Sequence, residues 1–287
     1  MKRAGDSELR TKRARETLES GGGNTVNAVT KALRVLDCFS PSRGRLTLGQ
    51  ISQQLGLPKS TVLNLIRTLE QSDYLLRGPD QSYQLGYKVL ELSYCLRSTL
   101  PIVQYAVPFL EELQIQTGET IYLTSHIGGR VLYLEGMYPS IRIGNYSITG
   151  KTLPLHCTGC GKAMMAYLPM EELEHVLNTW PLVRCTPNTI TDRDALLAEL
   201  EIIRKRGYAT DVEEETPGVK CVGVAIRDNN GYPVGAISVS GTVISMRDEL
   251  LDGYARMVSR VCHVLIGNSA QFPAAQMKEG TLPSREA

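Results

Sequence analysis

The sequence predicts a multidomain α/β protein with a helical N-terminal part and a C-terminal α+β domain built on an antiparallel sheet. Apolar residues recur at helical spacing in three segments between Val29 and Leu69. The rest of the chain alternates helical segments with strands, some of them joined by short turns, which favours antiparallel pairing. A length of 287 residues is sufficient for two domains, each with its own core.

Ionisable residues are divided unevenly between the two parts of the chain. Residues 1–98 contain 15 Lys and Arg and 9 Asp and Glu, whereas the remaining residues contain 16 basic and 21 acidic side chains. The formal net charge of the whole chain is only +1. A basic front part indicates a polyanionic partner for that part alone. Chance clustering would give the same counts, so charge alone leaves a nucleic-acid partner open.

The composition argues against an integral membrane protein and against a disulfide-rich secreted one. No apolar run approaches the roughly 18–20 residues that span a bilayer. The N-terminal segment MKRAGDSELRTKRARETLES lacks the apolar stretch of a secretory signal. Seven cysteines are spread thinly along the chain, which is typical of free thiols in a reducing compartment. We therefore expect a cytoplasmic protein that does not contact membranes.

Three helices are predicted in the N-terminal part, after a polar tail that ends in Ser-Gly-Gly-Gly. The first helix has apolar residues at helical spacing, namely Val29, Leu33, Leu36 and Phe39. Thr47 begins the second helix, because Gln50 follows it at capping-box spacing, and Gly56 ends that helix.

The third helix begins at Pro58 and has two chemically different faces. Its apolar stripe consists of Val62, Leu65, Ile66 and Leu69. Its opposite face carries Ser60, Asn64, Arg67 and Gln71. A solvated face is the commoner explanation for a polar stripe, but such faces are usually rich in Glu and Lys. Hydroxyl, amide and guanidinium groups instead suit contacts with phosphates and base edges.

A short hairpin follows the third helix, since YLLR (74–77) and SYQLG (82–86) flank the turn-forming segment GPDQ. Three helices and a hairpin predict a winged helix-turn-helix, in which the second helix of the pair enters the DNA major groove. The residues expected to contact DNA are Thr47, Lys59, Ser60, Thr61, Asn64, Arg67 and Tyr83.

The second half of the chain begins after a helical link at residues 87–97 and a helix from Pro101 to about Gly118. Strands are expected at 121–127, 131–137, 208–214, 221–228 and 233–240, and helices at 157–168, 170–178, 192–206 and 246–266. Gly-Gly and Asn-Asn-Gly turns join two of the strand pairs, as in antiparallel hairpins.

Three sequence blocks resemble the IclR-type family of bacterial transcriptional regulators. The first is LTLGQISQQLGLPKSTVLNLIRTLEQSDYL with the SYQLG strand after it. The second is LPLHCTGCGKAMMAYLP (153–169), and the third is RGYATDVEEETPGVKCVGVAIRDNNGYPVGAISVSG (206–241). In this order the blocks cover about residues 25–270. Cys157, Cys160 and Ala225 depart from the usual family pattern, so the effector of a relative cannot be transferred to this chain.

The resemblance implies a DNA-binding regulator, in most members a repressor, that works as a homodimer or homotetramer and needs no cofactor. It also implies a linker helix and a GAF-like domain that binds a small-molecule effector, which we expect to be a small organic or sugar acid. The expected divisions are a flexible basic tail at 1–24, a winged helix-turn-helix domain at 25–87, a linker helix at 88–101, an effector-binding domain at 102–271 and a C-terminal tail at 272–287.

The family pattern also implies which residues bind the effector. These are Gly159, Cys160, Asp211, Cys221, Ser238 and Ser240. Ser238 and Ser240 are two apart on a strand and therefore share a face. Hydroxyl groups and backbone amides can hold a carboxylate, and Asp211 can accept a hydrogen bond from a hydroxyl group. The alternative is that the serines face a polar core or solvent and that Cys221 only packs.

Other functions are less well supported by the sequence. His156, Cys157 and Cys160 are too few for a structural zinc site, which usually has four protein ligands, so we expect no metal. Redox sensing by the Cys157 and Cys160 pair would need a thiol with a lowered pKa. A cysteine-dependent hydrolase using His156 would leave residues 25–86 unexplained, so we expect no catalytic residues. A DNA-binding protein without a ligand remains open.

Overall fold

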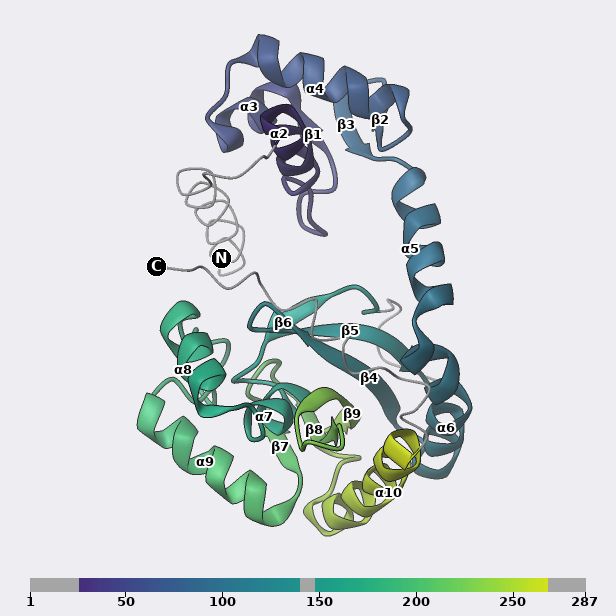
Figure 1. Ribbon diagram of the computed structural model, residues 1–287, viewed down its shortest axis with the longest axis vertical. Coiled ribbons are helices and arrows are strands. Elements are labelled where there is room, and N and C mark those ends of the chain that lie inside the picture. The colour runs from purple at the N-terminus through teal and green to yellow at the C-terminus, as the bar shows by residue number, and fades with distance from the viewer. Residues whose placement is uncertain (1–25, 140–147, 268–287) are drawn as a thin grey trace. The chain divides into compact units, whose positions relative to one another are not determined.

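The computed structural model describes residues 26–139 and 148–267. The two expected tails, residues 1–24 and 272–287, lie outside the described residues. The chain divides into two compact units between Arg97 and Ser98, and each is described here by itself (Figure 1). Within the part that is described, no helix is both long and apolar enough to cross a lipid bilayer.

The N-terminal unit consists of three helices and a three-stranded antiparallel sheet with the order β1-β3-β2. This arrangement confirms the predicted winged helix-turn-helix. Strand β1 was not predicted, because two residues carry no strand pattern. The elements are α2 (Asn27–Leu36), β1 (Leu46–Thr47), α3 (Leu48–Leu55), α4 (Lys59–Gln71), β2 (Leu75–Arg77) and β3 (Ser82–Leu85).

Local sequence signals fix the ends of α3. Thr47 accepts a hydrogen bond from the Gln50 backbone N–H, and the Gln50 side chain accepts one from the Thr47 backbone, which confirms the predicted capping box. Gly56 ends the helix with φ of 66°, in the left-handed region that glycine adopts without strain. The chain therefore turns sharply into α4.

The predicted apolar stripe of the first helix was wrong for two of its four residues. Val29 and Leu33 are each 56% exposed, whereas Val35 at the end of α2, and Phe39 just after it, are buried. Arg34 is also buried, and its guanidinium donates a hydrogen bond to the Leu55 carbonyl oxygen. This contact turns the Arg34 and Val35 side of α2 toward the core, so Val29 and Leu33 point outward.

Helix α5 (Lys88–Thr99) follows the hairpin and has no buried residue. The second unit is built on a six-stranded sheet with the order β6-β5-β4-β9-β8-β7, in which all neighbouring strands are antiparallel. Its strands are β4 (Thr120–Ile127), β5 (Arg130–Met137), β6 (Thr152–Pro154), β7 (Ala209–Val212), β8 (Val219–Arg227) and β9 (Pro233–Thr242).

Helices cover both faces of this sheet (Figure 1). Helices α6 (Pro101–Thr117) and α10 (Asp248–Gly267) pack on Val222, Val224 and the other large aliphatic side chains of one face. Helices α7 (Gly159–Met165), α8 (Met170–Thr179) and α9 (Arg193–Arg206) belong to the core of the other face, which includes Ala225 and Ala236. The predicted α+β domain with an antiparallel sheet is confirmed.

Candidate functional site

The polar face of α4 is open to solvent. Ser60, Asn64, Arg67 and Gln71 are exposed, as is Lys59 at the start of the helix, and Thr61 is half-buried. Val62, Ile66 and Leu69 on the opposite side are buried in the core of the unit. The helix is therefore held by its apolar face and offers hydroxyl, amide and guanidinium groups on the other.

Two of the residues expected to contact DNA, Thr47 and Tyr83, have structural roles in the N-terminal unit. Thr47 is exposed, but its hydroxyl group is engaged in capping α3 through Gln50. Tyr83 is only 3% exposed and packs in the core of the unit. The expectation that the Tyr83 side chain contacts DNA is therefore wrong, because its position on β3 points inward.

The wing carries a basic side chain that the sequence reasoning missed. Arg77 on β2 is exposed, and its guanidinium lies 5.9 Å from the centroid of the Tyr83 ring. A side-chain hydrogen bond to Gln81 across the turn also orients it. The strand spacing could not have identified Arg77, because residues two apart on a strand share a face and Leu75 is buried; its place at the turn end of β2 was the available signal.

In the second unit, strand register brings together residues that lie far apart in the sequence. Asp211 on β7 is paired with Cys221 on β8, and Cys221 is paired with Ser240 on β9. Residues paired directly across neighbouring strands share a face of the sheet. The Cys221 Sγ donates a hydrogen bond to the Ser240 Oγ at 3.0 Å. Ser238 is paired with Gly223 on one side and with Tyr122 on the other.

The start of α7 lies directly over this row of residues. Thr158 caps the helix by accepting a hydrogen bond from the Gly161 N–H at 3.1 Å. A Cβ atom at Gly223 would lie 2.5 Å from the backbone carbon of Gly159, so only glycine allows this approach. The first N–H groups of a helix have no acceptor within it. The Gly159 and Cys160 backbone therefore packs directly against β8, beside Cys221 and Gly223.

Burial controls the ionisation of this cluster. Asp211 is 3% exposed, and its burial raises the pKa of the carboxyl group to about 7. The Glu214 N–H donates to Asp211 Oδ1 at 2.8 Å and lowers that pKa, the Glu214 carboxylate raises it, and Lys162 lowers it. Burial also raises the pKa of the Cys160 thiol, while hydrogen bonds with Ser238 and Thr124 lower it. Cys160 and Ser238 are therefore in contact.

Tyrosines add an aromatic side to the cluster, which the sequence reasoning did not include. The rings of Tyr122 on β4 and Tyr133 on β5 meet edge to face with centroids 5.1 Å apart, and Tyr122 meets Tyr138 in the same way at 5.9 Å. Tyr133 is buried, which raises its pKa well above the usual value, and Cys160 and Cys221 add to that rise. Tyr133 therefore lies beside the residues from α7 and β8.

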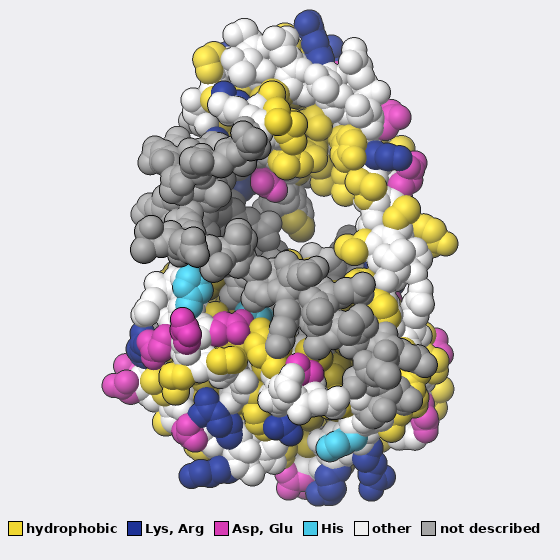
Figure 2. Space-filling model, viewed as in Figure 1, with side chains coloured by type: hydrophobic (Ala, Val, Ile, Leu, Met, Phe, Trp, Pro, Cys, Tyr) yellow, Lys and Arg dark blue, Asp and Glu magenta, His cyan; other side chains and the backbone are white. Residues whose placement is uncertain are grey.

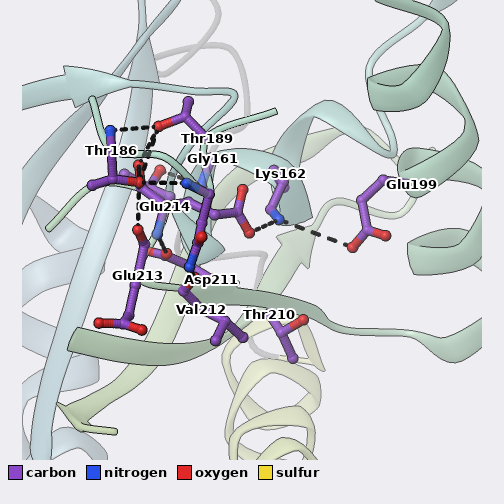
Figure 3. A network of polar contacts seen from close by, with 12 residues as sticks. Gly161, Lys162, Thr186, Thr189, Glu199, Thr210, Asp211, Val212, Glu213 and Glu214 are labelled. Carbon is purple, nitrogen blue, oxygen red and sulfur yellow. Dashed lines mark hydrogen bonds and ion pairs between the residues drawn. The ribbon is translucent and has the colours of Figure 1, made fainter. Parts of the chain in front are cut away.

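A buried ion pair supports the same region from the side of α7 (Figure 3). Lys162 is 1% exposed, bonds to Glu214 and lies 3.9 Å from Glu199. Thr189 Oγ1 donates to the Glu214 carbonyl oxygen at 2.7 Å, and Thr186 Oγ1 donates to that of Glu213. These contacts hold the segment that follows Asp211 in place.

An open depression next to Lys162 is lined by Glu199, Glu214 and residues of β7.

The side chains of His156, Cys157 and Cys160 have different partners, which argues against the zinc and hydrolase alternatives. His156 Nε2 lies 3.1 Å from the Val183 carbonyl oxygen. The Cys157 Sγ contacts the Sγ of Cys185 at 3.9 Å, and not the thiol of Cys160. Within the described ranges, no group of three or more His, Cys, Asp or Glu side chains could hold a metal ion.

Two family models match the chain. The IclR helix-turn-helix domain matches residues 28–79. The model described as bacterial transcriptional regulator IclR C-terminal matches residues 96–263, which is more than half of the chain.

Individual relatives agree with these matches. The HTH-type transcriptional regulator XynR of Escherichia coli (strain K12) is 34% identical over 250 residues, covering 87% of this chain and 99% of XynR. The HTH-type transcriptional repressor AllR of the same strain is 30% identical over 217 residues, covering 75% of this chain and 80% of AllR. The crystal structure of Thermotoga maritima IclR is similar with a TM-score of 0.66 and 32% identity, covering 84% of this chain and 98% of that one.

Proposed function

The chain belongs to the IclR family of bacterial transcriptional regulators, and on this premise we propose that α4 reads operator DNA and that the cluster beneath α7 binds the effector. The protein is a DNA-binding transcriptional regulator with an N-terminal helix-turn-helix domain and a C-terminal effector-binding domain. The proposal concerns the residues, the effector class and the assembly.

In the DNA interface, Asn64 and Arg67 contact base edges, because amide and guanidinium groups can form paired hydrogen bonds with adenine and guanine. Ser60, Thr61 and the flanking Lys59 contact phosphates and set the position of the helix. Arg77 adds a phosphate contact from the wing, and Thr47 adds one from the start of α3 once its hydroxyl group exchanges the Gln50 side chain for a phosphate oxygen. The observation that supports this proposal is the full exposure of the polar face of α4 opposite its buried stripe.

The proposal for the effector site rests on a row of paired residues that lies next to the start of α7. This row consists of Asp211, Cys221 and Ser240, and the backbone next to it is that of Gly159 and Cys160. The hydroxyl groups of Ser238 and Ser240 and the backbone of α7 hold a carboxylate. A neutral Asp211 can donate a hydrogen bond to the same ligand or accept one from its hydroxyl group. The effector is therefore a small organic acid or sugar acid, and the tyrosines supply an apolar side to the site.

The direction of regulation is repression. The relative AllR is named a transcriptional repressor, and by analogy DNA binding by this chain blocks transcription until the effector changes the affinity. An effector has this influence only if it binds the DNA-competent and the incompetent state unequally. The chain acts in the cytoplasm, where its DNA is, and catalyses no reaction.

The protein acts as a homodimer, or as a homotetramer formed from two dimers. Leu90 and Tyr94 on α5 are 69% and 74% exposed, and Tyr87, just before the helix, is 73% exposed. The three lie at helical spacing and form a stripe, and α5 has no buried residue. Figure 2 shows hydrophobic side chains on the surface along this helix. A contiguous exposed apolar stripe is typical of a protein interface. One recognition helix covers few base pairs, so a dimer is needed to specify an operator.

DNA binding and effector binding are assigned to different parts of the chain, so each can be tested separately. We retain residues 25–87 as the DNA-binding domain, 88–101 as the linker helix and 102–271 as the effector-binding domain. The first test captures fragments of the protein's own genome with the full-length chain and sequences them. Recovery of a shared sequence motif is expected, and fragments without any shared motif would contradict specific DNA reading.

The effector class is tested by calorimetry with hydroxy acids, keto acids, sugar acids and aromatic acids. We expect one class to bind the wild type and to bind Ser240→Ala about ten- to a hundredfold more weakly, the effect of losing a hydrogen bond to a charged ligand. Equal affinity for both proteins would place the site elsewhere. Hydrolysis of an ester or amide by the purified protein would favour the hydrolase alternative, and binding of DNA but of no acid would favour a ligand-independent protein.

A further inference from the structure

Two thiols from separate segments meet beside the start of α7. The Sγ atoms of Cys157 and Cys185 lie 3.9 Å apart, although the residues are 28 positions apart in the sequence. Cys157 is fully buried, whereas Cys185 is exposed in the loop between α8 and α9. A hydrogen bond between thiols already holds the two sulfur atoms next to one another.

Neighbouring contacts fix both segments in this arrangement. His156, the residue before Cys157, bonds through Nε2 to the carbonyl oxygen of Val183, two residues before Cys185. On the other side, the Cys185 N–H donates to Thr189 Oγ1 at 3.0 Å. These two hydrogen bonds hold the segments on either side of the thiol pair, so the position of Cys185 next to Cys157 is fixed by the fold.

We propose that Cys157 and Cys185 are a site of reversible oxidation, at which a hydroperoxide converts the two thiols into a disulfide bond. The sulfur atoms must approach from 3.9 Å to about 2.05 Å, the length of a disulfide. Rotation of the exposed Cys185 side chain provides this movement, since solvent is on one side of it.

The reaction balances with one molecule of hydrogen peroxide. The hydrogen bond with Cys185 and burial raise the pKa of the Cys157 thiol, so the exposed Cys185 thiol reacts first. It is oxidised to a sulfenic acid, and the peroxide is reduced and releases one water. The Cys157 sulfur then attacks the Cys185 sulfur, the S–S bond forms, and the hydroxyl group leaves with the Cys157 proton as a second water. A dithiol reductant reverses the bond by thiol–disulfide exchange.

The other cysteines are placed differently. Cys38 and Cys262 are buried in the cores of the two units. Cys221 bonds to Ser240, and Cys160 contacts Ser238. Cys95 is exposed, but it lies on α5 in the N-terminal unit. Among the described cysteines, therefore, Cys185 combines exposure with a second thiol in contact.

The bond would join two segments that both support the proposed effector site. One is the turn into α7, which carries Gly159 and Cys160. The other is the loop in which Thr186 and Thr189 hold the Glu213 and Glu214 backbone. Only this regulatory meaning rests on the proposed function, because the oxidation itself needs no effector. We expect amide hydrogen exchange in residues 183–189 to slow after oxidation.

The test uses the full-length protein, hydrogen peroxide and peptide mapping by mass spectrometry under non-reducing conditions, after alkylation of remaining thiols. We expect a linked pair of peptides containing Cys157 and Cys185, a protein lighter by two hydrogen atoms, and full reversal by dithiothreitol. Cys185→Ser, a change at an exposed position that leaves the fold intact, abolishes the link. The matched control Cys95→Ser, at an exposed cysteine of the other unit, retains it.

Several results would overturn the proposal. One is Cys185 oxidised to a sulfinic acid while Cys157 still reacts with the alkylating reagent. Others are a link from Cys157 to Cys160, or an intermolecular link through Cys95 in place of the expected pair. No step of this experiment uses an effector or DNA, so its failure is distinguishable from failure of the proposed effector site.

Discussion

At the scale of single residues, the fold alters the charge of Asp211 near neutral pH. Burial raises its pKa to about 7, so the carboxyl group is largely neutral below that pH and ionised above it. In the neutral form it can donate a hydrogen bond to an acid bound between Ser240 and α7. In the ionised form it repels a ligand carboxylate at short range.

The affinity for an acidic effector should therefore fall as the pH rises through about 7. The sign follows from the raised pKa, since the binding-competent protonated form is lost on the alkaline side. The decrease is at most about tenfold per pH unit if only the neutral form binds. Calorimetry at about pH 6 and about pH 8 measures it. Asp211→Asn, which is neutral at both values, should show little change, and an equal decrease in this variant would assign the titration to another group.

Lys162 and Glu214 form a buried ion pair, and loss of either partner would leave the other charge buried without compensation. The Lys162 ammonium group bonds to Glu214, and Glu214 Oε2 is a buried oxygen without a hydrogen-bond partner in the described part of the chain. Replacing the lysine would leave an uncompensated carboxylate in a region of low dielectric. Its contribution is thus to hold the segment after Asp211 rather than to touch the ligand.

We expect Lys162→Met to lower the free energy of unfolding by about 3–5 kcal/mol, as for other buried ion pairs that lose one partner. The double variant Lys162→Met with Glu214→Leu should regain much of this loss, because it removes both charges. Urea unfolding of all three proteins measures the difference. A loss below about 1 kcal/mol for the single variant, which is typical of exposed pairs, would mean that solvent reaches the pair.

At the scale of elements, the two faces of α4 have different roles, one in the stability of the fold and the other in the proposed recognition of DNA. Its buried stripe attaches the helix to the N-terminal unit, and its exposed face is the one that we propose reads DNA. Substitutions on the exposed face should therefore change affinity without changing stability.

Asn64→Ala and Arg67→Ala should each weaken operator binding by about 1–3 kcal/mol, the contribution of a good bidentate base contact. Electrophoretic mobility shifts measure the affinity, and circular dichroism checks the fold. Arg260→Ala removes the same kind of exposed side chain from α10 and serves as the control, with wild-type affinity expected. Wild-type affinity in both α4 variants would contradict the assignment of the recognition helix.

Elements with strong local signals were predicted well from sequence. The Thr47 and Gln50 capping box and Gly56 fixed the ends of α3, and the apolar stripe of α4 matched its buried face. Strands β1 and β6 were missed because their few residues carry no periodic pattern. The outward direction of Val29 and Leu33 depends on the buried contact of Arg34 with Leu55, which joins distant residues.

The candidate effector site was predictable only in part. The Ser238 and Ser240 spacing showed that these residues share a face, but their neighbours come from other strands. The pairing of the strands places Tyr122 and Tyr133 next to the cluster, which the sequence does not reveal. Cys185 contacts Cys157 from a loop that has no recognisable sequence motif. Tyr83 was misplaced for a similar reason, because the inward face of a short hairpin is set by the helices beneath it.

At the scale of the whole molecule, α5 explains why a dimer is expected. Tyr87, just before α5, and Leu90 and Tyr94 on it are exposed, and such an apolar stripe is unfavourable in water unless a partner covers it. In the proposed dimer, a second copy of this chain would supply a matching stripe and double the number of recognition helices.

The double variant Leu90→Asp with Tyr94→Asp should shift the protein from dimer toward monomer in analytical ultracentrifugation, because it places charges in the proposed interface. Operator affinity should fall with it, since one recognition helix makes about half of the contacts. Neither residue is buried within the chain, so the fold is retained and the melting temperature of each domain serves as the control. An unchanged sedimentation coefficient would show that the dimer interface, if present, lies elsewhere.

The central claim is that a small acid bound beneath α7 changes how the protein binds its operator. The most direct measurement is the operator dissociation constant of the full-length chain, titrated by fluorescence anisotropy with and without each acid of the panel. We predict that at least one acid changes this constant for the wild type, and that Ser240→Ala needs about ten- to a hundredfold more of the same acid for an equal change. If no acid alters operator binding, or if an acid acts equally on both proteins, the effector does not bind at this cluster.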